Sequence, residues 1–199
     1  MTRPRFGDRD GHAGFVSDPS AACTQTLFSN GVKVGDADCA GGTFNVAPGN
    51  ASYRLEASGR QTVLGLSTRV SGAWTFTSET ARSPVQLPLM SVRLQPPLGK
   101  NNQGTAGTTK VPVAVHQIGQ SGAIALSSLT VQASFDDGKT WVALPVTATD
   151  RDRAQWEAQL TAPASASFVS FRAAATDLKR NTVELTVVRA YAVSTGQAR

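Results

Sequence analysis

The sequence contains no run of about 18 apolar residues, so it encodes no transmembrane helix and we expect no membrane insertion. Residues 1–15 carry basic groups but no apolar segment, so we expect no secretory signal peptide within this chain. The net charge of +5 comes from 19 basic and 14 acidic residues spread over both halves. Because nucleic-acid binding needs a clustered basic stripe, we expect no nucleic-acid partner.

Histidine is scarce, and His12 and His116 are too far apart in sequence to have the spacing of metal ligands. No G-x-S-x-G segment is present, and no serine stands in a catalytic context. The sequence therefore offers no catalytic residue, and we expect that the chain is not an enzyme.

Cysteine is limited to Cys23 and Cys39. They are either two free thiols of a cytosolic protein or a disulfide that closes a hairpin around Asn30-Gly31. A disulfide across a loop of this size would stabilise the fold by roughly 3 kcal/mol. We favour the disulfide, and with it an extracellular location whose signal peptide lies upstream of this chain.

Apolar and polar residues alternate along many segments, which predicts strands with one buried face. Turn signals such as Asn30-Gly31 and Asp137-Gly138 separate these segments. Regular short strands of this kind predict an all-β sandwich. The expected strands include residues 51–57, 73–78, 111–115, 155–160, 168–175 and 182–191.

Residues 94–110 are rich in Pro, Gly, Asn and Thr and have no periodic apolar face, which indicates a linker or an opening loop. We place a domain boundary near Pro97. Residues 1–14 would be a tail or the remnant of a preceding domain. Two tandem immunoglobulin-like or fibronectin-like β-sandwiches would follow, at 15–97 and 98–199, each about the size of one such domain.

The aromatic residues are expected to stabilise the sandwich. Alternation places Trp74, Trp141 and Trp156 in the core. Tyr53 is either the tyrosine of a tyrosine corner or an ordinary strand residue. Exposed aromatics on one flat face would instead indicate sugar binding, because sugars pack on aromatic rings.

The segment SFDDGKTW, residues 134–141, matches S-x-D-x-G-x-T-W and resembles the Asp-box of sialidases and related β-propellers. In such a box the acidic and hydroxyl side chains bind turn backbone, the glycine takes a positive φ and the tryptophan packs beneath. Asp136, Gly138, Thr140 and Trp141 are expected in these parts. A single box cannot build a propeller, so the motif predicts a hairpin.

Clustered carboxylates give weak candidates for a calcium site at Asp136, Asp137 and Asp177, since hard cations prefer such oxygens. Their spacing does not match an EF-hand loop. No other cofactor is expected.

Several segments, taken in order, resemble the C-terminal, non-catalytic β-rich region of large secreted subtilisin-like serine peptidases of actinobacteria. They include YRLE, STRVSGAWTF, SFDDGKTW and NTVELTVVRAY, and the resemblance covers residues 15–193. In that family the Asp, His and Ser triad lies upstream in a separate α/β domain, so no catalytic residue is carried over. One departure is Arg180, which stands where a glycine commonly precedes the asparagine and predicts a longer or strained turn.

The resemblance implies a non-catalytic accessory module of an extracellular peptidase, which serves stability, positioning, or substrate or surface contact. Its partner would be the preceding peptidase domain or that domain's substrate. Two alternatives stay open. The chain could be an independent module that binds a polysaccharide or a cell surface, or a fragment of an Asp-box glycosidase.

Overall fold

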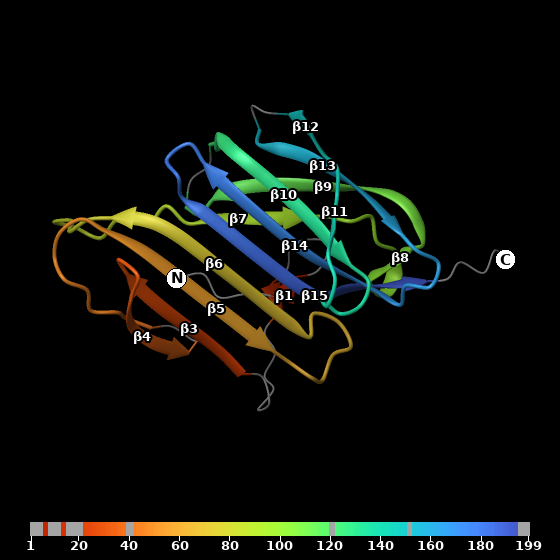
Figure 1. Ribbon diagram of the computed structural model, residues 1–199, viewed down its shortest axis with the longest axis horizontal. Coiled ribbons are helices and arrows are strands. Elements are labelled where there is room, and N and C mark those ends of the chain that lie inside the picture. The colour runs from red at the N-terminus through yellow and green to blue at the C-terminus, as the bar shows by residue number, and fades with distance from the viewer. Residues whose placement is uncertain are drawn as a thin grey trace.

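The computed structural model describes residues 6–7, 13–14, 22–38, 42–119, 122–150 and 153–194. This part of the chain is all-β, with two facing sheets and one short 3-10 helix, η1 (Lys100–Asn102) (Figure 1). The predicted all-β sandwich is therefore confirmed. None of the described residues forms a helix long and apolar enough to cross a membrane.

The larger sheet contains nine strands and runs through both halves of the chain. Within it, β8 (Gln103–Thr105) pairs in parallel with the end of β15. The other strands, in spatial order, are β11 (Val142–Ala143), β10 (Leu126–Ser134), β14 (Phe168–Asp177), β15 (Thr182–Ser194), β6 (Arg69–Ser78), β5 (Ala51–Arg60), β3 (Ala22–Ser29) and β4 (Val32–Asp38).

The smaller sheet has four strands and faces the β10–β14–β15 part of the larger one. A separate two-stranded sheet pairs β1 (Phe6–Gly7) with β2 (Ala13–Gly14). The strands of the smaller sheet, in spatial order, are β12 (Val146–Asp150), β13 (Gln155–Ala162), β9 (Gly107–Gln117) and β7 (Met90–Leu94).

Strands from the two halves of the sequence pair directly in both sheets. Figure 1 shows β6 lying beside β15, and seven residue pairs join them, including Val70 with Val187. In the smaller sheet β7 pairs with β9, with Val92 opposite Val115. The boundary expected near Pro97 therefore does not coincide with a break between sheets.

The main core lies between the two sheets and follows the predicted alternation. Val111, Val113 and Val115 of β9 are at most 1% exposed, and Ala158 and Leu160 of β13 are fully buried. Burying one such aliphatic side chain contributes about 1.5–3 kcal/mol. These strands form because every second side chain is apolar and is buried between the two sheets.

A second, smaller core cluster lies under the strands of the first half. It consists of Leu27, Tyr53, Phe76 and Leu89, and the Tyr53 ring stacks on Phe76 at 5.7 Å. Tyr53 pairs with Ser29 and with Phe76 inside one sheet, so it does not lie where the chain passes between sheets. It acts as an ordinary strand residue rather than as a tyrosine corner.

Trp74 connects the two core clusters. Its half-buried ring packs against both, and its indole N–H donates a 2.7 Å hydrogen bond to the Met90 carbonyl. Met90 belongs to the smaller sheet and is fully buried in the main core. One side chain thus ties the first-half strands to the sandwich.

Candidate functional site

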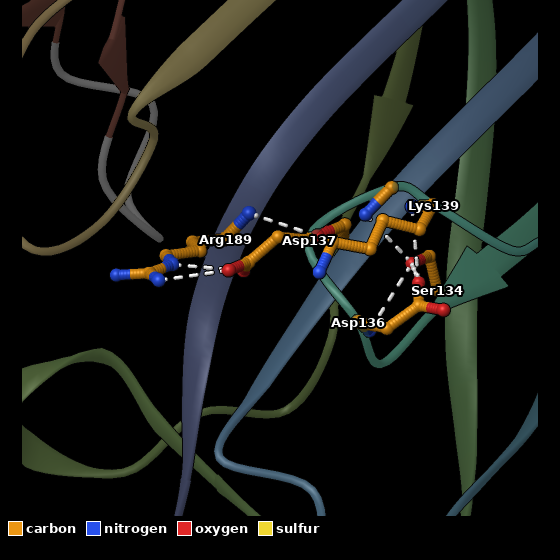
Figure 2. A network of polar contacts seen from close by, with 7 residues as sticks. Ser134, Asp136, Asp137, Lys139 and Arg189 are labelled. Atoms are coloured by element: carbon orange, nitrogen blue, oxygen red, sulfur yellow. Dashed lines mark hydrogen bonds and ion pairs between the residues drawn. The ribbon is translucent and has the colours of Figure 1, made fainter.

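The Asp-box segment folds as a turn between β10 and β11 (Figure 2). The Ser134 hydroxyl donates to Asp136 Oδ1 at 2.8 Å and accepts the Gly138 N–H at 2.9 Å. Asp136 Oδ1 also accepts the N–H groups of Lys139 and Thr140, at 3.0 and 2.9 Å. Asp136 Oδ2 accepts the Thr140 hydroxyl at 2.6 Å. Gly138 has φ +82°, which favours glycine.

These bonds determine the acidity of Asp136. The hydrogen bonds from the Thr140 hydroxyl, the Thr140 N–H and Ser134 lower its pKa to about 2. A carboxylate with such a pKa is a poor proton acceptor at neutral pH. Asp136 therefore stabilises the turn rather than supplying acid–base chemistry.

The second carboxylate of the box is bound from a distant strand. Arg189 donates to Asp137 Oδ1 and Oδ2, both at 2.8 Å, and this interaction lowers the pKa of Asp137 (Figure 2). The Arg189 guanidinium also lies 4.5 Å from the centre of the Phe168 ring. A bidentate pair of this kind fixes both position and angle, so it holds the turn against β15.

A bulge in β15 aims Arg189 at the turn. The pairing with β14 shifts between Val169–Tyr191 and Phe171–Val187, and Arg189 has φ +55°. Ser170 of β14 accepts the Arg189 N–H at 3.0 Å. Bulges re-aim side chains in this way. Alternation alone predicted an unbroken strand here, so sequence reasoning missed Arg189.

The loop between β5 and β6 also contacts Arg189. The Ser67 N–H donates to the Arg189 carbonyl at 2.7 Å. The Gln61 side chain, only 1% exposed, donates to the carbonyls of Leu64 and Leu66 and accepts the Leu64 N–H. Segments from both halves of the chain therefore meet around the Asp-box.

Trp141 differs from its expected place in the core. It is half-buried but belongs to neither core cluster. Its indole N–H donates to the Gly138 carbonyl at 3.1 Å, and the Arg172 guanidinium lies 4.8 Å from its ring centre. Trp74 and Trp156 are also half-buried, but both pack against the main core.

The candidate calcium ligands do not come together. Asp136 and Asp137 follow the end of β10, whereas Asp177 lies opposite Leu126 at its beginning, roughly 25 Å away at the rise of a strand. Asp177 binds the N–H groups of Lys179 and Asn181 in the β14–β15 turn. No cluster of three or more metal-ligand side chains occurs in the part of the chain that the structure describes.

The same β14–β15 turn contains Arg180, the residue that stands where the resemblance leads us to expect a glycine. This residue has φ +66°, the left-handed region that a glycine would occupy without cost. The Arg180 N–H donates to the Asp177 carbonyl at 3.1 Å. The turn is therefore held in the strained form that the sequence predicted.

The expected disulfide cannot be placed in full, because Cys39 lies outside the described residues. Cys23 lies in β3, next to Thr24, which pairs with Asp38 in the β3–β4 hairpin. The disulfide stays a prediction.

A polar hollow of about 300 Å³ lies on the outer face of the large sheet, away from the core. It spans β3, β5, β6 and β15, where Gly72 and Ala73 leave a low floor between longer side chains. Arg54 donates from Nε to Glu56 at 2.7 Å and lies 3.6 Å from Glu184. The other lining residues are Thr24, Thr26, Ala57, Ser58, Ser71 and Thr186.

No family model matches the chain, and no curated protein matches it in sequence. Sequence reasoning missed the hollow because its residues come from four strands that the topology brings together from both halves.

Proposed function

We propose that this chain is a non-catalytic accessory module of an extracellular subtilisin-like serine peptidase, and that it serves stability, positioning or surface contact. The observation that carries the non-catalytic part of the proposal is the Asp-box network, and the peptidase parent rests on the sequence resemblance. Its two carboxylates, Asp136 and Asp137, are bound by the turn itself and by Arg189. The residues that most resemble catalytic ones in the sequence are thus used to hold the fold.

The same observation argues against Asp136 or Asp137 as the acid of a glycosidase fragment. A glycosidase acid must hold a proton near neutral pH, which requires a raised pKa. The pKa values of Asp136 and Asp137 are both lowered by their hydrogen-bond partners. These groups stay ionised where such an acid must be protonated.

The broad outer face of the nine-stranded sheet supports a contact role. It continues across strands from both halves and carries hydroxyl and charged side chains around the hollow. A rigid sheet of this kind presents a surface that does not have to be ordered upon contact.

The genomic reading frame upstream of Met1 tests the proposal directly. A peptidase domain with an Asp, His and Ser triad is expected there. The peptidase produced with the module should keep its activity to a higher temperature than the peptidase without it. An upstream frame without a peptidase, or turnover of a fluorogenic peptide or sialoside by the pure 199-residue chain, would overturn the proposal.

A further inference from the structure

A row of hydroxyl groups crosses the outer face of the large sheet. Cross-strand pairing places Thr24 beside Ser58, Ser58 beside Ser71, and Ser71 beside Thr186. The next residue in this row, on β14, is Arg172. Five strands at a spacing of about 4.8 Å give the row a length of roughly 19 Å. Such a row can exchange hydrogen bonds with an extended polymer rich in hydroxyl groups.

Two arginines flank the row on one side. Arg60 and Arg69, both exposed, lie directly opposite each other at the ends of β5 and β6. Like charges in this position repel and destabilise the strand pair. Within the described part of the chain, no ion pair joins either arginine to an acidic group. An anion placed between them would relieve the repulsion.

Arg172 is held in place before any ligand arrives. Its guanidinium lies over the Trp141 ring, and its Nε donates to Gln132 Oε1 at 2.7 Å. Among the described residues, no hydrogen bond or ion pair involves its two terminal amino groups, and such groups can bind a carboxylate in bidentate fashion. Fixing the side chain in advance lowers the entropy cost of binding.

Arg69 reaches the same neighbourhood. A Cβ on Gly138 would lie 3.6 Å from Arg69 Nη2 and 3.2 Å from the Trp141 ring. Arg69 and the ring that carries Arg172 therefore both lie against Gly138. The Asp-box turn thus helps to gather two guanidinium groups beside the hydroxyl row.

We propose that this outer face binds an acidic polysaccharide, a polymer of sugar residues that carry carboxylates. Its carboxylates contact Arg60, Arg69 and Arg172, and its hydroxyl groups contact the row from Thr24 to Thr186. The inference deepens the proposed accessory function, since it names the chemical class of surface with which the module makes contact.

The opposite side of the row sets the orientation of the polymer. Glu56 and Glu184 line the hollow there, held by Arg54. Carboxylates accept hydrogen bonds from sugar hydroxyls but repel an anionic group. The polymer therefore directs its carboxylates toward the three arginines and its free hydroxyls toward the glutamates.

Affinity electrophoresis of the full chain in gels containing polygalacturonate tests the inference, with dextran as the neutral control. We expect polygalacturonate to retard the chain and dextran to leave its mobility unchanged. The substitutions Arg69→Gln and Arg172→Gln should each weaken binding about tenfold, as expected for a lost charged hydrogen bond. Ser71→Ala should weaken binding about threefold.

Matched variants on the smaller sheet serve as controls. Arg93→Gln removes the same charge from the exposed surface of β7, and Ser91→Ala removes a hydroxyl from the same strand. Both should bind as the unmodified chain does. Equal weakening by Arg93→Gln would show that net charge alone drives retention, and that result would overturn the inference.

Two other outcomes would also overturn it. Equal binding of polyglutamate would show that carboxylates suffice without sugar hydroxyls, and tighter binding of duplex DNA would assign the face to nucleic acid. The proposed accessory function fails separately. If no peptidase is encoded upstream, the accessory function is contradicted, and the electrophoresis result still tests the polysaccharide site. If polygalacturonate does not retard the chain, the polysaccharide site is contradicted, and the upstream reading frame still tests the accessory function.

Discussion

Arg189 binds both carboxylate oxygens of Asp137 at 2.8 Å, although 52 residues separate the two in sequence. The same arginine accepts the Ser67 N–H at its carbonyl and stacks on Phe168. One bulged residue therefore joins the Asp-box, the β5–β6 loop and β14. This junction connects the two halves of the chain outside the core.

Asp137 tests the strength of this junction. Asp137→Asn keeps a side chain that tolerates φ +61° but removes the charge, and it should lower the free energy of unfolding by about 1 kcal/mol. Asp137→Ala also loses the backbone preference and should cost more. Urea unfolding of both variants measures the difference. Equal stability of all three proteins would show that the ion pair contributes nothing.

Asp136 should make stability depend on acid pH. Its folded-state pKa of about 2 lies below the ordinary value of 3.8, so its stabilising contribution is complete above pH 4. That contribution is lost as the pH falls toward 2. The melting temperature of the unmodified chain should exceed that of Asp136→Asn at pH 6, and the gap should narrow between pH 4 and pH 2. A gap independent of pH would contradict this assignment.

Trp74 should hold the first-half strands to the sandwich. Trp74→Phe keeps an aromatic ring but leaves the buried Met90 carbonyl without its donor, at a cost of about 1–3 kcal/mol. Thermal unfolding followed by circular dichroism measures the loss. Trp156→Phe is the matched control, since this ring packs against the same core. An equal loss in both variants would assign the effect to packing alone.

Gln61 should keep the β5–β6 loop in one conformation. Gln61→Ala removes three hydrogen bonds to Leu64 and Leu66 and should destabilise the chain by about 1–3 kcal/mol. Amide exchange at Leu64 should become faster, while exchange in β9 should change only with global stability. Unchanged protection at Leu64 would show that the loop does not depend on this side chain.

The predicted disulfide between Cys23 and Cys39 is open to a simple test. Mass spectrometry after alkylation without reductant should find neither thiol modified, and modification of both after reduction. The double substitution to alanine should lower the free energy of unfolding by about 3 kcal/mol. Alkylation of both cysteines before reduction would disprove the disulfide.

Local patterns in the sequence were sufficient for several of the strands and turns. Alternation in β9 and β13 correctly gave buried Val113 and Leu160, and the spacing from Ser134 to Trp141 gave a turn with a glycine at positive φ. The prediction that Trp141 lies in the core was wrong, because the alternation of apolar residues was taken to indicate burial in the core. The residue lies past the turn, on a surface where Arg172 covers it.

The composition around Pro97 predicted a domain boundary, but strands on its two sides pair in both sheets. The sequence around it has the composition of a linker, yet β7 before it and β9 after it are neighbours in one sheet. The pairing of distant strands depends on which strand edges of the sheet are still unpaired. The local composition around Pro97 does not indicate this pairing.

By itself, the sequence determined the all-β class, the buried faces and the Asp-box turn, because each depends on residues within a few positions of one another. Only the tertiary structure decided that β6 pairs with β15, that Arg189 reaches Asp137 and that Arg69 and Arg172 both lie beside the Asp-box turn. These relationships join residues far apart along the chain, and they arise only when both sheets close over a common core.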